Sequence, residues 1–261
     1  MRTTDMADEL FSGAAQPLPA GVRLATARHG GVTVTRVEIT REGLARPRGR
    51  YVTLEMPSVS VLDERDTDVI ETGAAELRAL LPPEGPVLVL GIGNRRVTAD
   101  ALGPRTAQKI LVTMGPQHTL PVRGIRPVAA LAPGVSGDTG LTLRQLAAAM
   151  VDAVRPAALI CVDSLCSAEA ARLGRTIQFS DTGLHPADAR HARHLDAAAL
   201  GVPVIAAGIP TLMDADEGAD LVLTPRALDS VIAHGSALLA GILNRALQPR
   251  LSVAQLCWLT G

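Results

Sequence analysis

The chain has 261 residues, 47% of them hydrophobic, and its formal net charge is −1. Such a chain can bury a sizeable core as one large globular domain, and its balanced charge disfavours a polyanion-binding surface and hence nucleic-acid binding. Aromatic residues make up only 2% of the chain, so the core must be aliphatic, and recognition of bases or sugars by stacking is disfavoured as well.

The first third of the chain predicts an arm followed by antiparallel strands. Residues 1–20 are small and polar and end in two prolines, which we interpret as a mobile or extended arm. Two β-like stretches, 22–27 and 32–39, flank Gly30-Gly31, and residues 50–56 form a third candidate strand. We expect these strands to form an N-terminal β-hairpin layer or a sheet edge.

From residue 66 onward, predicted helices and strands alternate. Apolar residues at helical spacing predict helices over 66–81, 100–114, 141–154 and 227–247. Short apolar runs predict buried strands at 87–92, 127–132, 157–162, 175–179 and 202–207. This alternation predicts an α/β fold, a three-layer sandwich with a mainly parallel central sheet of the phosphorylase/hydrolase-like kind.

The predicted elements divide the chain into three segments. We expect an N-terminal arm over residues 1–20, a single α/β domain over 21–249 and a C-terminal tail over 250–261. The tail has two large apolar side chains, Leu256 and Trp258, which we expect to dock on the body.

Cysteine usage and the absence of targeting signals indicate the compartment. The three cysteines, Cys161, Cys166 and Cys257, are too few and too unevenly placed for a disulfide framework, which indicates a reducing environment. Neither a secretion signal nor an apolar run of membrane length is recognisable. We therefore expect a cytoplasmic protein with no membrane partner.

The stretch from Val87 to Pro104 is the most informative part of the sequence. A buried strand runs into Gly91-Ile92-Gly93-Asn94, and a polar turn then leads to Asp100 at the start of a helix. Open α/β sheets place their chemistry outside the carboxyl ends of such strands. A dinucleotide site would need its third glycine at position 96, which is Arg96, and a phosphate-loop lysine is missing. We expect no cofactor.

Two aspartates form the strongest catalytic hypothesis. Asp100 follows the strand at 87–92, and Asp163 follows the strand at 157–162. In a parallel sheet both carboxylates would emerge at one edge, where a pair sharing one proton can activate water and protonate a leaving amine. Spacing alone nevertheless favours a simpler explanation for each, a strand-end cap or a helix N-terminal carboxylate. Asp181 also follows a strand, so it too is expected near this edge.

Histidines and a thiol give weaker hypotheses. His185, His191 and His194, with Asp188 between them, are compatible with a metal site, but we favour a surface histidine cluster and expect no metal. Cys166 has no identifiable partner histidine, so we interpret it as a small buried thiol and not as a nucleophile.

The order of motifs along the whole chain resembles one known family. The motifs are Gly91-Ile92-Gly93-Asn94, Asp100-Ala101-Leu102-Gly103-Pro104, Ala132-Pro133-Gly134-Val135, Val162-Asp163-Ser164-Leu165, Ser180-Asp181-Thr182-Gly183 and Gly208-Ile209-Pro210-Thr211. Together they resemble the spore germination protease (GPR endopeptidase) family. The resemblance implies a fold shared with hydrogenase-maturation peptidases.

The resemblance also implies a function. It implies a cytoplasmic endopeptidase of the spore core, usually a homotetramer, that starts degrading small acid-soluble spore proteins during germination and cleaves after an acidic residue. The family's two proposed catalytic aspartates fall on Asp100 and Asp163, which reverses our preference for the simpler explanation. Asn94, Thr98 and Asp181 are expected to bind substrate or support the site.

The sequence departs from the family in three places, one of which is Asp138 where an uncharged residue is expected, and two alternatives stay open. Its opening motif starts at residue 2, so we expect no removable pro-segment unless the start is misassigned, and residues 184–190 replace a glycine-rich stretch. One alternative is a metal-assisted peptidase of the hydrogenase-maturation type. The other is a non-catalytic relative that binds spore proteins.

Overall fold

The computed structural model describes residues 4–12, 17–62, 65–115, 124–185, 194–214 and 221–260. Its strands are β1 (Val22–His29), β2 (Val32–Ile39), β3 (Gly49–Glu55), β4 (Val87–Gly91), β5 (Val128–Leu131), β6 (Ala158–Cys166), β7 (Thr176–Ser180), β8 (Val204–Asp214) and β9 (Val222–Leu223). Its α-helices are α1 (Glu9–Ser12), α2 (Thr67–Leu80), α3 (Leu102–Ala107), α4 (Ser136–Thr139), α5 (Leu143–Val154), α6 (Ala197–Leu200), α7 (Leu228–Leu247) and α8 (Val253–Thr260). Three short 3-10 helices are η1 (Val59–Val61), η2 (Thr98–Asp100) and η3 (Ala170–Arg172).

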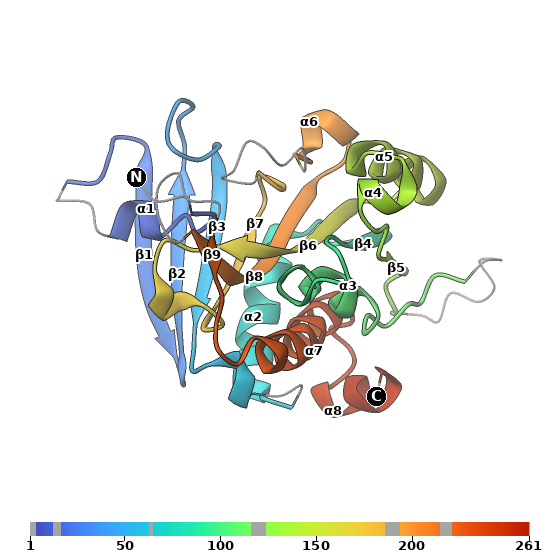
Figure 1. The fold of residues 1–261 in the computed structure, drawn as a ribbon. Coiled ribbons are helices and arrows are strands. Elements are labelled where there is room, and N and C mark those ends of the chain that lie inside the picture. Colours follow the sequence, from blue (N-terminus) through green and yellow to red (C-terminus); the bar gives the residue numbers. More distant parts are fainter. Residues whose placement is uncertain are drawn as a thin grey trace.

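The described strands form one mixed sheet in the order β1-β2-β3-β7-β8-β6-β4-β5, with β9 added beside β8 (Figure 1). The α/β fold is therefore confirmed. The parallel arrangement that we expected extends only over β8, β6, β4 and β5. All other pairings are antiparallel.

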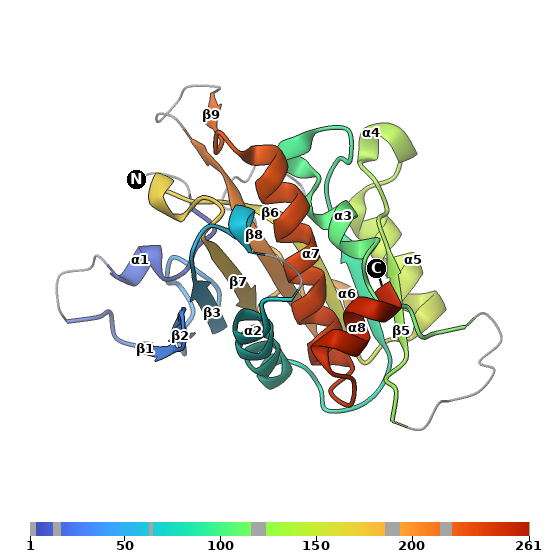
Figure 2. The same ribbon diagram turned by 90° about the horizontal axis from the view of Figure 1, so that it is seen from below.

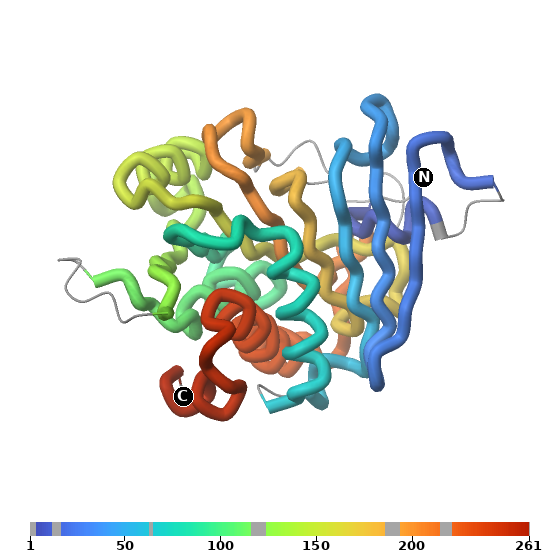
Figure 3. Tube along the Cα trace, turned by 180° about the vertical axis from the view of Figure 1, so that it is seen from behind, coloured from blue at the N-terminus to red at the C-terminus, as the bar shows by residue number. Residues whose placement is uncertain are grey.

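The N-terminal hairpin continues this sheet and is not a separate layer. β3 pairs with β7, with Tyr51 opposite Ser180, so β1 and β2 form the sheet's outer edge (Figure 3). β7 itself is antiparallel to β8, and its short connection to β6 explains this direction. Residues 167–175 connect β6 to β7 and are too few for the crossover helix that a parallel strand would need.

Helices cover both faces of the sheet, and β6 shows why. Ile160 and Val162 belong to the core cluster under α2, α3 and α7, whereas Leu159 and Cys161 belong to the cluster under α5 (Figures 1 and 2). Alternate side chains of one strand are thus buried on opposite faces, which explains its uninterrupted apolar sequence.

The long helix α7 is a core helix. The helix is long and apolar enough to cross a membrane, but 67% of its most apolar 18-residue stretch is buried inside the protein. Its buried side chains, among them Ile232, Leu239 and Leu243, pack in the same cluster as α2 and the sheet.

The two ends of the described chain differ from expectation. Within the segment expected to be a mobile arm, Met6 and Ala7 are fully buried, and the Ala7 N–H donates to Gln178 Oε1 at 2.7 Å. At the other end Leu256 docks as expected, but Trp258 is 83% exposed. Polar neighbours of Met6 and Ala7 also contact distant parts of the chain, such as Asp8 with Arg172, whereas Trp258 lies on the solvent side of the short helix α8.

Candidate active site

The turn after β4 holds Asp100 in a fixed position. Gly93 has φ +123°, and a Cβ atom there would lie 2.1 Å from the carbonyl oxygen of Asp100, so only glycine fits. The next residue, Asn94, donates its backbone N–H to Asp100 Oδ2 at 2.7 Å. Its own side-chain oxygen accepts from the Arg96 N–H at 2.9 Å. The glycine-rich turn thus fixes the position of the Asp100 carboxylate.

A second glycine brings this segment against β4 and β6. A Cβ atom on Gly103, in the first turn of α3, would lie 2.3 Å from the carbonyl oxygens of both Ile92 and Val162. The helix can therefore approach the ends of these strands only because residue 103 has no side chain. Asp100, two residues before α3, therefore lies close to the carboxyl end of β4 and to Val162 of β6.

The strand β8 also holds this segment in place. The buried Thr211 donates from Oγ1 to the carbonyl oxygen of Ala99 in η2 at 3.0 Å. Thr211 lies where the register between β6 and β8 shifts, a type of irregularity that can re-aim a side chain beside an active site. Thr98, the first residue of η2, is half-buried in the same segment.

Asp163 lies at the same edge, inside β6. Asp163 is only 4% exposed, and its Oδ1 accepts a hydrogen bond from the Ser164 N–H at 2.8 Å. It pairs with Gly208 of β8, three residues before Thr211. Gly91, the last residue of β4, pairs with Val162, so the turn that leads to Asp100 starts beside Asp163.

Ser164 is a polar residue of this edge that sequence reasoning did not single out. Its Oγ is buried and has no hydrogen-bond partner among the described residues. A buried hydroxyl without a partner is costly unless water or a ligand satisfies it. The only signal in the sequence was its position next to Asp163.

Asp181 does not lie where we expected it. Because β7 is antiparallel to β8, Gln178 pairs with Gly208 but Ser180 pairs with Ala206, so the chain moves away from Asp163 as it approaches Asp181. There Asp181 accepts from the backbone N–H and the Nε of Arg50, both at 2.7 Å. The expectation that Asp181 shares the edge of the other two aspartates is wrong, because the short connection from β6 makes β7 antiparallel to β8.

The thiols near the site are unsuited to nucleophilic chemistry. Burial, followed by the charges of Asp214 and Asp5, raises the pKa of Cys166 to about 12. Burial and then the charge of Asp163 raise the pKa of Cys161 as well. Both side chains are therefore neutral thiols near pH 7, and the thiolate is the nucleophilic form.

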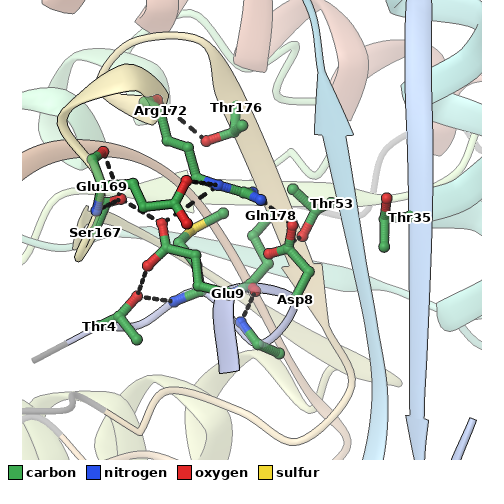
Figure 4. A network of polar contacts seen from close by, with 12 residues as sticks. Thr4, Asp8, Glu9, Thr35, Thr53, Ser167, Glu169, Arg172, Thr176 and Gln178 are labelled. Atoms are coloured by element: carbon green, nitrogen blue, oxygen red, sulfur yellow. Dashed lines mark hydrogen bonds and ion pairs between the residues drawn. The ribbon is translucent and has the colours of Figure 1, made fainter. Parts of the chain in front are cut away.

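A buried charge network anchors the N-terminal segment beside β6 (Figure 4). Arg172 Nη1 is 2.5 Å from Asp8 Oδ2, and Arg172 Nε is 3.5 Å from Glu9 Oε1. Glu9 also accepts from the Ala168 N–H at 2.9 Å and from the Ser167 hydroxyl. Although burial opposes its charge, the interactions with Asp8 and Glu169 raise the pKa of Arg172. The network fixes the chain that follows Asp163.

The same N-terminal segment also contacts the last residue of β6 directly. The Asp5 N–H donates to the carbonyl oxygen of Cys166 at 2.8 Å, and the Cys166 N–H donates to Asp5 Oδ2 at 2.8 Å. Sequence reasoning missed these contacts because the partners are far apart in the chain.

The proposed histidine cluster is described only in part. His191 and Asp188 lie outside the described residues. His185 and His194 are close together beyond the end of β7, with ring centroids 4.1 Å apart.

Comparisons with known proteins agree on one family. The germination protease family model matches residues 6–217. The germination protease of Clostridium perfringens strain SM101 is 32% identical over 278 residues, which cover 84% of this chain and 86% of that protein. The germination protease of Bacillus velezensis FZB42 is 38% identical over 221 residues, which cover 78% of this chain and 58% of that protein.

A solved structure gives a weaker match. The NiFe hydrogenase maturation protease HycI of Thermococcus kodakarensis KOD1 aligns with a TM-score of 0.43 and 16% identity, over 66% of this chain and 98% of that chain. A match at this level carries no argument about fold or function.

Proposed function

The chain belongs to the germination protease family, and on that premise we propose that it is the endopeptidase that starts the degradation of small acid-soluble spore proteins during germination. The proposal includes a location in the spore cytoplasm and assembly into a homotetramer. The observation that supports it most is the pairing of Gly91, the last residue of β4 before the turn to Asp100, with Val162, the residue before Asp163. Two carboxyl groups at one site are what aspartate-dependent peptide hydrolysis needs.

In the proposed mechanism a water molecule lies between the two carboxyl groups, which share one proton. The ionised carboxylate takes a proton from this water while the water oxygen forms a bond to the carbonyl carbon of the scissile peptide bond. The protonated group donates first to the carbonyl oxygen and then, as the C–N bond breaks, a proton passes to the leaving nitrogen. Since a coupled pair titrates as a unit, the acid and base roles belong to the pair. The Ser164 hydroxyl is available to bind a water molecule nearby.

Incubation with a small acid-soluble spore protein, with and without a chelator, tests this proposal against its alternatives. We expect equal cleavage in both samples. Loss of cleavage with chelator and recovery on adding a divalent metal would favour a metal-assisted peptidase. Binding of the spore protein without any fragments would favour the non-catalytic relative.

Cleavage after an acidic residue requires a positive group beside the reacting atoms. Arg95 and Arg96 are exposed on the turn that leads to Asp100. Arg96 Nη1 lies 3.4 Å from Asp138 in an exposed pair that water screens, so its guanidinium can meet a substrate carboxylate. We propose that these two arginines favour an acidic residue before the scissile bond.

Charge reversal tests this role. We expect the Arg95→Glu/Arg96→Glu variant to lower kcat/KM for a glutamate-containing peptide by roughly tenfold. The attraction between the two arginines and the substrate glutamate is replaced by a repulsion of about 1 kcal/mol. The same variant should lose its preference for glutamate over glutamine at that position. Arg28→Glu, an exposed change on the outer strand β1, is the matched control. Equal losses for the glutamate and glutamine peptides would remove the arginines from specificity.

The neutral state of Cys166 gives another prediction. Cys166→Ser should keep peptidase activity within about twofold, and iodoacetamide should not inactivate the wild type, because the pKa of about 12 leaves almost no thiolate at pH 7. Initial rates before and after alkylation measure this. Rapid inactivation that the serine variant escapes would point to a thiol mechanism instead.

A further inference from the structure

Three side chains of the kind that bind metals gather at the opposite edge of the sheet from Asp163. His185, His194 and Asp196 each offer one ligand atom, and these atoms all lie within 4.8 Å of one another. His185 follows the end of β7, and the other two residues precede α6, which leads into the start of β8. Asp163, in contrast, pairs with Gly208, farther along β8.

Backbone hydrogen bonds hold the two arms of this cluster together. The Leu184 N–H donates to the Leu195 carbonyl oxygen at 2.8 Å, and the Leu195 N–H donates back to Leu184 at 3.1 Å. Both leucines are buried. The residues next to them, His185 on one arm and His194 and Asp196 on the other, are therefore brought together by an anchored backbone, and not by the chance approach of long side chains.

The side chains are already oriented by the interactions that support metal ligands. His185 Nε2 is 2.8 Å from the carbonyl oxygen of Thr182, which can only accept, so Nε2 carries the proton and Nδ1 keeps a free lone pair. Such a carbonyl partner on the second ring nitrogen is typical of metal-bound histidine.

The carboxylate of Asp196 is fixed as well. Its Oδ1 caps α6 by accepting from the Ala199 N–H at 2.8 Å, and its Oδ2 lies 2.8 Å from His194 Nε2. A metal ion would take the place of the proton between these two side chains.

We propose that His185, His194 and Asp196 form a binding site for a zinc-type divalent transition ion. Two imidazoles and one carboxylate suit Zn²⁺, Co²⁺ or Ni²⁺ better than Mg²⁺ or Ca²⁺, which prefer all-oxygen sites. The fourth position of a tetrahedral ion is left for water or another ligand. Because the cluster lies at the far edge from Asp163, the ion stabilises the junction between β7 and β8 and takes no part in peptide hydrolysis.

Titration of the full chain with ZnCl₂ tests this site. Calorimetry should give one ion per chain for the wild type and at least tenfold weaker binding for His194→Ala. Zn²⁺ should raise the melting temperature of the wild type by several degrees and leave that of the variant unchanged, since a ligand that binds only the folded state stabilises it. Co²⁺ should give the visible absorption of a tetrahedral ion in the wild type alone.

Two controls make the outcome decisive. His234→Ala removes an exposed histidine whose Nδ1 lies 2.8 Å from the Ser60 carbonyl oxygen, and it should bind zinc like the wild type. His194→Ala should keep the wild-type rate of peptide cleavage, so failure of the peptidase proposal would leave the zinc result standing. Absence of stoichiometric zinc binding, or equal binding by wild type and His194→Ala, would overturn the site.

Discussion

Asp100→Asn and Asp163→Asn are each expected to lower kcat for cleavage of a small acid-soluble spore protein by about 10²–10⁴-fold, the usual contribution of a positioned acid or base. The amide keeps the size of the carboxyl group but can neither take a proton from water nor supply one. Removing both carboxyls should cost little more than removing one, because the pair works as a unit. Initial rates of substrate loss, with thermal melting to verify folding, measure the effect.

Asp181→Asn is the matched control for this experiment. Asp181 directly follows β7, whose chain runs away from Asp163, and it accepts hydrogen bonds from Arg50. Its amide variant should keep at least about half of the activity, since an exposed ion pair contributes about 1 kcal/mol or less to stability. A loss equal to that of Asp163→Asn would contradict the assignment of the catalytic edge.

Arg172→Ala is expected to lower the free energy of unfolding by about 3–5 kcal/mol, the cost of leaving buried charges without their partner. The side chains of Asp8 and Glu9 are each 3% exposed, and Arg172 is the cation that both contact. The N-terminal segment should then detach from the end of β6. Urea unfolding measures the loss, and hydrogen exchange at Ala7 and Ala168 reports the detachment.

The exposed pair of Arg23 and Glu38 provides the comparison. Its side chains are 78% and 46% exposed, so Arg23→Ala should change the unfolding free energy by less than about 1 kcal/mol. The double variant Asp8→Asn/Arg172→Met should recover part of the loss, because it removes the buried charges on both sides. A small effect of Arg172→Ala alone would show that the segment is held by Met6 and Ala7 instead.

Local patterns predicted the elements that pack mainly through their own apolar face. The helix expected over 66–81 is α2 (Thr67–Leu80), and the strand expected at 87–92 is β4 (Val87–Gly91). β8 was predicted to end near residue 207 but continues to Asp214, through Pro210. Proline argues against a central strand, yet here the chain pairs with β6 on one side across an irregular register. Only the neighbouring strand reveals this extension.

The positions of the candidate site residues could be predicted from the sequence only where the direction of the neighbouring strand could be predicted. β4 and β6 are parallel as expected, but β6 continues through Asp163 to Cys166, beyond the strand end that the sequence predicted. Asp181 follows an antiparallel strand, and nothing in residues 175–179 records that direction. The network around Arg172 was not predictable, because Asp8 pairs with a residue 164 positions away. Charged residues in a small polar segment look solvent-exposed until such a partner is known.

The most direct test of the account is mass spectrometry of a small acid-soluble spore protein after incubation with the wild-type chain and with Asp163→Asn. With the wild type we predict two complementary fragments, produced by cleavage of a single peptide bond that follows a glutamate or aspartate. With the variant we predict intact substrate. Intact substrate from both proteins, or the same fragments at the same rate from both, would contradict the proposal of an aspartate-dependent endopeptidase.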